Sequence, residues 1–338
     1  MSKKTIKEWL SFNEQTRKNI YNEVALRKGI PDNAIEKDWW VVQTLTLLFS
    51  MSCAPHLIFK GGTSLSKGWN LIERFSEDID LVIDREFLGF TGDLTTRDIK
   101  NLRKASKKYI VTVFTEELQA AFIGAGFTDV QVKAREFVSS GQDPMILEIY
   151  YPKLTEPDSY LKPGILVEIG SRSLVEPFTP CSFRSLVADI FADSAFADEA
   201  ITVPTANPER TFLEKIFLLH EEFQKPAERI RVERLSRHLY DLEKLMQLEV
   251  CQDVLNNAEL YNTIVEHRSK LTPLAEVDYT LHQPKSIRFL PPKELLPDWE
   301  ADYQQMQEYM IYGKSLSFSE LIEKLSQLQS QINNIEWK

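Results

Sequence analysis

Residues 59–84 read FKGGTSLSKGWNLIERFSEDIDLVID, and the predicted architecture starts from them. Residues 56–60 predict a short strand, Gly61-Gly62 a turn, and residues 64–74 a helix that starts at this turn. Because glycine has no Cβ, such a turn lets the backbone approach an anion closely. Its amides and the start of the helix can then bind a phosphate group.

An acidic pair follows on the second predicted strand, residues 79–83. Asp78 and Asp80 are two positions apart, so their side chains point to the same side of an extended chain. Two like charges this close are unfavourable without a cation, and Mg²⁺ binds one or two carboxylates together with substrate phosphates. Glu168 on a later strand is the first candidate for a third carboxylate, and Glu148 is the alternative.

The remaining pattern predicts an α+β protein with a small mixed sheet. Helices are predicted over residues 4–29, 33–51, 95–123, 209–223, 227–248, 252–269 and 316–335. Strands are predicted at Asp129–Phe137, Met145–Tyr151, Gly164–Ile169 and Cys181–Leu186. We predict N-terminal helices over residues 1–54, an α/β core over 55–205 and a helical C-terminal domain over 206–338.

Composition narrows the class of protein. The chain has 338 residues, 43% of them hydrophobic, and a formal net charge of −10, which argues against non-specific coating of nucleic acid. Two local segments, residues 97–108 and 225–237, are nevertheless basic. No apolar run approaches the ~20 residues that span a bilayer, and the N-terminus has no apolar signal core. We therefore expect a cytoplasmic protein.

The segment from Phe59 to Leu81 resembles the signature of the AbiEii/AbiGii family of nucleotidyltransferase toxins, part of the polymerase-β-like nucleotidyltransferase superfamily. Further similarity runs from about residue 20 to 245, in the segments Glu36–Val41, Tyr151–Gly170, Thr211–Ile216 and Arg237–Leu242. One position departs from the family pattern: His238 stands where an aspartate is usual, three residues before the matching Asp241.

The resemblance implies a polymerase-β-like core and a role for each residue of the motifs. The implied catalytic residues are Asp78, Asp80, Glu168, Lys215 and Asp241, of which Asp78, Asp80 and Glu168 would bind Mg²⁺ or Mn²⁺. The implied nucleotide-binding residues are Lys60, Gly61, Gly62, Thr63, Ser64, Lys67, Arg74 and Ser76. Arg74 could instead pair with Glu77.

The resemblance also implies transfer of a nucleoside monophosphate from an NTP, in a toxin–antitoxin or phage-defence system with a cognate antitoxin. Some relatives modify the 3′ end of tRNA. The basic segments fit an RNA acceptor, through Arg103, Lys104, Lys107, Lys108, Arg231, Arg234 and Arg237. A protein or small-molecule hydroxyl as acceptor, and a non-catalytic binding module of the same fold, are the alternatives.

Overall fold

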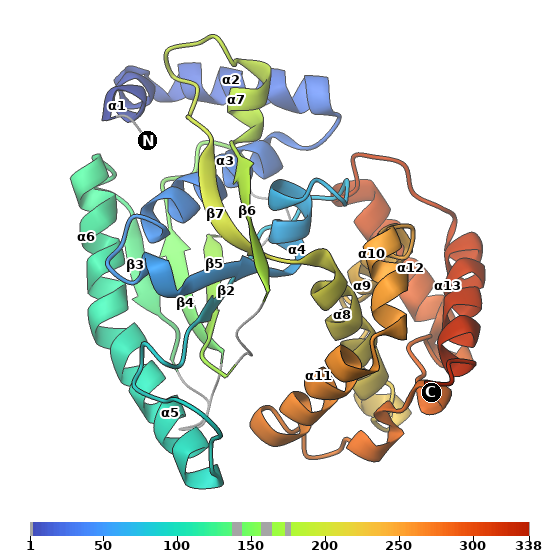
Figure 1. Cartoon of the computed structure of the whole chain (residues 1–338). Coiled ribbons are helices and arrows are strands. Elements are labelled where there is room, and N and C mark those ends of the chain that lie inside the picture. Colours follow the sequence, from blue (N-terminus) through green and yellow to red (C-terminus); the bar gives the residue numbers. More distant parts are fainter. Residues whose placement is uncertain (1–2, 137–143, 157–163, 173–176, 338) are drawn as a thin grey trace. The chain divides into compact units, whose positions relative to one another are not determined.

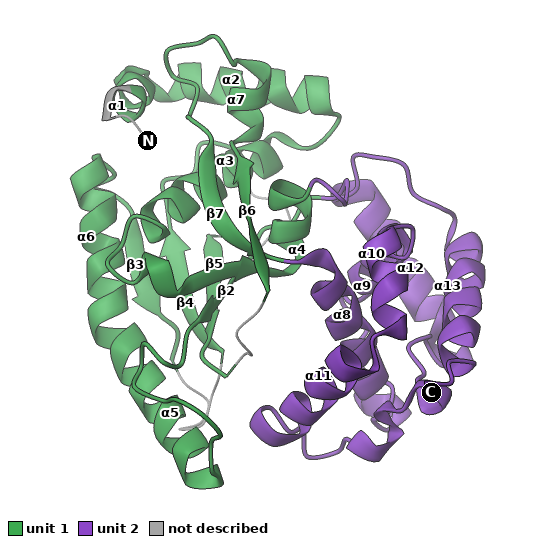
Figure 2. Cartoon of the chain, viewed as in Figure 1, with its two compact units in different colours: residues 1–69, 75–206 green, residues 70–74, 207–338 purple. Residues whose placement is uncertain are grey.

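A computed structural model describes residues 3–136, 144–156, 164–172 and 177–337. The chain forms two compact units (Figure 2). Unit 1 comprises residues 1–69 and 75–206, and unit 2 comprises residues 70–74 and 207–338. Among the described residues, no helix is both long and apolar enough to cross a membrane.

Unit 1 contains a seven-stranded mixed sheet with the strand order β3-β4-β5-β2-β1-β7-β6 (Figure 1). Neighbouring strands run antiparallel except for the parallel pairs β2–β5 and β1–β7. The strands are β1 (Leu57–Lys60), β2 (Ile79–Ile83), β3 (Gln131–Ala134), β4 (Met145–Tyr150), β5 (Ile165–Gly170), β6 (Phe178–Phe183) and β7 (Ile201–Ala206). The predicted α+β class is confirmed.

Strand β7 has no counterpart in the sequence prediction, because Pro204 interrupts its apolar pattern. A proline removes a ladder donor and is tolerated mainly near sheet edges. Here Pro204 lies opposite Pro180 of β6, which forms one edge of the sheet. The strand predicted over Asp129–Phe137 is shorter in the structure, and its last residue, Phe137, lies outside the described residues.

Within the described residues, three α-helices precede the sheet: α1 (Lys3–Ser11), α2 (Glu14–Lys28) and α3 (Asp32–Leu48). The single helix predicted over residues 4–29 is wrong, because the Asn13 side chain accepts a hydrogen bond from the Thr16 amide and starts a new helix. Gly29, with φ +69°, ends α2 as predicted.

Of the remaining helical segments of unit 1, the first directly precedes β1 and the others lie between the strands. They are η1 (Ala54–His56), α4 (Gly61–Thr63), the π-helix η2 (Ser64–Gly68), α5 (Thr96–Tyr109), the π-helix η3 (Ile110–Phe114), α6 (Thr115–Ala125) and α7 (Leu186–Ile190). The helix predicted over residues 64–74 ends at Gly68, because Asn70 takes a positive φ of 52° and residues 70–74 belong to unit 2.

Unit 2 is helical. Its α-helices are α8 (Pro208–Glu222), α9 (Ser236–Leu245), α10 (Glu249–Asp253), α11 (Ala258–Leu271), α12 (Leu296–Tyr309) and α13 (Phe318–Asn333). Short 3₁₀ turns connect them: η4 (Ala227–Arg229), η5 (Val254–Asn256), η6 (Tyr279–His282), η7 (Pro284–Ser286) and η8 (Lys293–Leu295). The helix predicted over residues 227–248 is wrong before Ser236. The structure adds α12, which has Pro297 in its first turn, where proline is tolerated.

Helix α3 is the most deeply buried helix segment of unit 1, with every residue from Ala34 to Leu45 buried. Three consecutive charged residues on it have partners on other segments of the unit. Glu36 accepts hydrogen bonds from the amides of Leu154 and Thr155. Lys37 pairs with Glu77, and Asp38 pairs with Lys67 and accepts from the Leu186 amide. These contacts attach α3 to the segments that flank the sheet.

We expect Lys37→Met to destabilise the protein by about 3–5 kcal/mol, because it would leave the buried Glu77 carboxylate without this partner. Urea denaturation followed by circular dichroism measures the change. The control is Lys100→Met on the exposed face of α5, for which the change should stay within about 0.5 kcal/mol. Equal midpoints for the two variants would contradict a stabilising role for the pair.

Candidate active site

Three charged residues lie in one row across the sheet of unit 1. Asp80 of β2 is opposite Lys60 of β1 and beside Glu168 of β5 in the strand register. Residues paired directly in this way have side chains on the same face, about 4.5–5.5 Å apart at Cβ. All three are half-buried, whereas Ile79 and Val167 on the opposite face are buried. Asp80 thus lies between a cation and a second carboxylate.

The alternative carboxylate, Glu148 on β4, lies outside this row. β4 places Ile146, and not Glu148, opposite Glu168. The Tyr150 hydroxyl donates to the Glu148 carboxylate at 2.6 Å, and Arg135 pairs with it at 2.7 Å. The hydrogen bond from Tyr150, with further help from Arg135, lowers the pKa of Glu148. The register therefore favours Glu168 as the carboxylate that neighbours Asp80.

The Asp80 carboxylate lies against the glycine turn. Gly61 has a φ of +79°, a conformation that side chains disfavour. A Cβ added at Gly61 would lie 1.9 Å from Oδ2 of Asp80, which is far inside van der Waals contact. Glycine is therefore required at this position twice over, by its backbone conformation and by the space that the carboxylate occupies.

Hydrogen bonds join the glycine turn to the acidic strand. The buried Thr63 hydroxyl donates to the backbone carbonyl of Asp78 and lies 3.0 Å from the hydroxyl of Ser76. The Ser64 hydroxyl donates to the Gly61 carbonyl at 2.8 Å, and the Ser64 amide donates to the same carbonyl. The amide and hydroxyl of Ser64 therefore both donate to Gly61, and phosphate binding by Gly61, Gly62, Thr63 and Ser64 stays a prediction.

Lys67, predicted to bind nucleotide, lies in η2 with its ammonium group 2.7 Å from Asp38 on α3. Its side chain is only 11% exposed. Glu77, which directly precedes Asp78, pairs with Lys37 of the same helix. Two charged residues of α3 thus contact the two segments that carry the predicted motif.

The chemistry of the row suits a hard divalent cation, since its donors are carboxylate oxygens on the half-buried face. Within the described parts of the chain, no group of three or more His, Cys, Asp or Glu side chains is close enough to hold a metal ion. A pair is sufficient for Mg²⁺ when substrate phosphates supply the other ligands. Asp80 and Glu168 are adjacent carboxylates in the strand register, and Asp78 lies two residues before Asp80, so metal binding by these three residues stays a prediction.

In unit 2, three residues of the predicted site form one buried cluster around Asp241 on α9. Arg74 donates to both carboxylate oxygens, from Nε to Oδ1 and from Nη2 to Oδ2, each at 2.7 Å. Lys215 Nζ of α8 lies 2.7 Å from Oδ2. The sequence analysis kept an ion pair between Arg74 and Glu77 as an alternative. In the structure, Arg74 makes a bidentate contact with Asp241.

Burial and neighbouring charges set the protonation states in this cluster. Burial opposes ionisation of Asp241, but Arg74 and Lys215 outweigh it and hold the pKa of the carboxyl well below its usual value. Burial also lowers the pKa of Lys215, which Asp241 partly offsets. His238, at the position of the usual aspartate, has its Nδ1 3.4 Å from Lys215 Nζ. Burial, and then the charge of Lys215, lower the pKa of His238 well below its usual value, so the ring is neutral.

The basic residues of α5 form an exposed stripe. At spacings of three or four residues, the exposed side chains are those of Arg97, Lys100, Lys104 and Lys108. Arg103 and Lys107, also predicted to bind RNA, are half-buried.

The second basic segment does not form a stripe. Arg231 pairs with Glu222 at 3.0 Å. The Arg234 amide donates to Asp302 from a backbone with φ +61°, and Arg237 is half-buried in the first turn of α9. These three residues therefore share no helix face, and of the two predicted segments only α5 presents a continuous basic surface.

A glycine turn beside carboxylates on adjacent strands is the arrangement that the sequence resemblance to nucleotidyltransferases led us to expect. The family model "Nucleotidyl transferase AbiEii toxin, Type IV TA system" matches residues 46–324. The chain belongs to this family of nucleotidyltransferase toxins from type IV toxin–antitoxin systems, as its motifs predicted. The match continues well beyond residue 245, where the motif similarity ended.

Among solved structures, the chain is similar to MenT4, a nucleotidyltransferase toxin from Mycobacterium tuberculosis H37Rv. The two sequences are 19% identical, the alignment covers 94% of this chain and 99% of MenT4, and the TM-score is 0.46. No curated protein sequence matches the chain.

We expect Gly61→Ala to lower nucleotidyl-transfer activity by at least about 100-fold, because the added Cβ would displace the Asp80 carboxylate. The matched control is Gly89→Ala. Gly89 also has a positive φ, of +87°, but its Cβ would meet no atom within 4 Å. Both variants should lose about 1 kcal/mol of stability from backbone strain. Equal activity in the two variants would disprove the steric argument.

We also expect stability to fall as the pH drops below about 6.5, the usual pKa of an exposed histidine. The folded protein holds the pKa of His238 low, so only the unfolded chain binds the extra proton, and this binding lowers the free energy of the unfolded chain as the pH falls. The effect reaches up to about 1.4 kcal/mol per pH unit for one histidine.

Urea denaturation at several pH values between 7 and 5 measures this slope. His238→Asn should make it shallower. His220→Asn should do the same, because burial lowers the pKa of His220 to about 4. A slope that neither substitution changes would contradict the neutral, buried state of these rings.

Proposed function

We propose that this toxin transfers a nucleoside monophosphate from an NTP to an RNA 3′ end, most simply that of tRNA, with a divalent metal as cofactor. Such a modification would block translation. The observation that supports the proposal most directly is the row of Lys60, Asp80 and Glu168 beside the Gly61 turn. Family membership supports the reaction class and implies a cognate antitoxin as partner.

Asp78, Asp80 and Glu168 would hold the metal ion, Mg²⁺ or Mn²⁺, which supplies charge neutralisation at the triphosphate when bound. The glycine turn would bind the phosphates through the amides of Gly62 and Thr63. Lys60 would add a positive charge beside Asp80. Ser76, Ser64 and Lys67 support these groups through the hydrogen bonds and the ion pair described above.

In the proposed reaction, the RNA hydroxyl oxygen forms a bond to the α-phosphorus of the NTP. The bond from that phosphorus to the pyrophosphate oxygen breaks, and pyrophosphate leaves. Glu168 is the carboxylate proposed to accept the proton of the hydroxyl. Lys215 would neutralise phosphate charge, and Asp241 would orient Lys215 and Arg74 through the contacts described above.

The exposed basic stripe of α5 supports RNA as the acceptor. A small-molecule acceptor would not require a line of cations spaced along a helix, whereas an RNA backbone binds by neutralising successive phosphates. The stripe lies in unit 1 and carries Lys104 and Lys108 at its C-terminal end.

Label transfer tests the proposal. Purified protein is incubated with Mg²⁺, total tRNA and each α-³²P-labelled NTP in turn, beside an Asp80→Ala variant. Label on tRNA in the wild type alone is the expected result, and it identifies the nucleotide. Label on protein, or on neither acceptor with any NTP, would reject transfer to tRNA.

We further expect the double variant Lys104→Gln/Lys108→Gln to weaken RNA binding and to reduce its salt dependence. The slope of log K against log [salt] is negative, and its magnitude should decrease by about 0.7 for each RNA phosphate that the variant no longer neutralises. Filter binding between 50 and 200 mM salt measures it. The control with the same change in charge is Lys285→Gln/Lys293→Gln, at two exposed positions of unit 2. Identical slopes for the two variants would remove α5 from the RNA-binding surface.

A further inference from the structure

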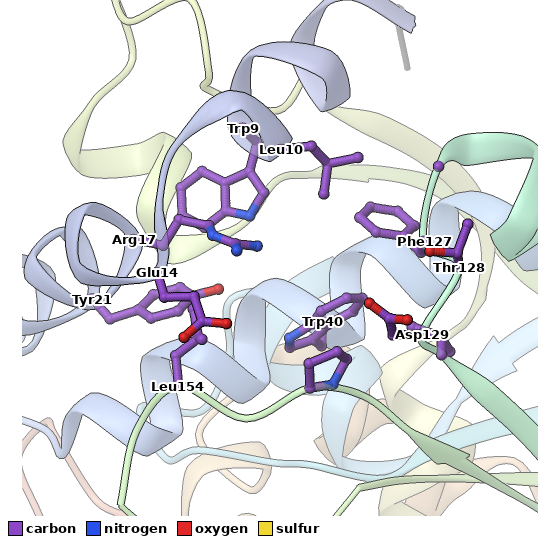
Figure 3. A pocket seen from close by; sticks show the side chains of 13 residues that line it. Trp9, Leu10, Glu14, Arg17, Tyr21, Trp40, Phe127, Thr128, Asp129 and Leu154 are labelled. Atoms are coloured by element: carbon purple, nitrogen blue, oxygen red, sulfur yellow. The ribbon is translucent and has the colours of Figure 1, made fainter.

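A cavity of about 150 Å³ lies in unit 1 between α1, α2, α3 and the segment that follows α6 (Figure 3). Its walls are aromatic: Trp9, Tyr21, Trp40 and Phe127 line it, and all four are buried. Trp40 is fixed by stacking on Tyr151, with ring centroids 4.9 Å apart and an interplanar angle of 20°. The walls are therefore held before any ligand enters.

Charged groups lie at the mouth of this cavity. Glu14 and Arg17 are one turn apart on α2, and Asp129 follows α6. Figure 3 shows the Arg17 guanidinium and the Asp129 carboxylate directed toward the space between Trp9 and Trp40, and the Glu14 carboxylate beside Leu154 at the edge of the cavity. Glu14 and Asp129 are exposed, whereas Nε of Arg17 is buried and has no hydrogen-bond partner within the described chain. A buried donor of this kind is costly unless a ligand supplies an acceptor.

Size and charge define the ligand. An engineered cavity of about 150 Å³ holds one benzene ring, so this cavity holds a single six-membered ring. Two carboxylates against one guanidinium give the mouth a net negative charge, which disfavours a phosphate group. Arg17 can donate a hydrogen bond, and Glu14, one turn away on α2, can accept one. A ring edge that carries an acceptor nitrogen beside an amino group complements this pair.

We propose that this cavity binds an aminopyrimidine base of the cytosine type. The ring packs against the aromatic walls, its N3 or O2 accepts from Arg17, and its 4-amino group donates to a carboxylate at the mouth. Carboxylates recognise cytosine through this amino group. Uracil has a carbonyl oxygen at the same position, which the carboxylates repel. The base belongs either to a free nucleoside or to single-stranded RNA, whose bases stack on aromatic side chains.

Isothermal titration calorimetry without NTP or Mg²⁺ tests the proposal, and it is independent of nucleotidyl transfer. The probes are cytidine and uridine for the free source, and the oligoribonucleotides C₆ and U₆ for the RNA source. To keep the catalytic residues out of the result, every titration uses the Asp80→Ala background. We expect at least one cytosine probe to bind about tenfold or more tightly than its uracil counterpart. Cytidine binding assigns a free ligand, and binding of C₆ alone assigns RNA.

Variants locate the site. Glu14→Gln and Asp129→Asn change exposed side chains at the mouth, so they should fold normally, and each should weaken cytosine binding by about tenfold. The control is Glu116→Gln, an exposed carboxylate on α6 that does not line the cavity. It should leave binding unchanged. The proposal fails if cytosine and uracil probes bind equally, if neither binds, or if the control weakens binding as much as the two mouth variants.

Discussion

The helical unit depends on one buried carboxylate. Asp241 is fully buried, yet it remains ionised because Arg74 and Lys215 both contact it. Removing a partner from such a cluster leaves an uncompensated charge in a low-dielectric interior, which is far more costly than losing a surface pair. The contact joins residues 167 positions apart and fixes the lysine that the proposed mechanism requires.

Unit 1 also contains buried ion pairs, here between helix α3 and segments next to the sheet. Helix α3 places Lys37 and Asp38 in the interior, and each has a partner beside the predicted motif, Glu77 before the acidic strand and Lys67 after the glycine turn. Apolar packing tolerates small rotations of a helix, whereas an ion pair specifies a position and direction. Buried ion pairs therefore connect the segments that carry the predicted motifs in both units.

Much of this arrangement could be predicted from local spacing. Alternation along β2 and β5 put Asp80 and Glu168 on the polar face of their strands, and the two glycines marked the turn. The register that makes them neighbours is a long-range property, as is the pair of Arg74 with Asp241, and neither leaves a local pattern. The helix predicted over residues 64–74 ends at Gly68, because residues 70–74 leave unit 1 and become part of unit 2, which no local pattern indicates. The roles of these residues remain predictions.

The route of the chain limits how the protein can be divided. It passes between the units after Trp69, after Arg74 and after Ala206, so the helical unit is built from two separate stretches of sequence. A gene segment that encodes residues 207–338 alone would lack the buried Ile72 and the guanidinium that neutralises Asp241. Transfer of residues 207–338 alone as a terminal module would therefore separate the helical unit from a part of its own interior.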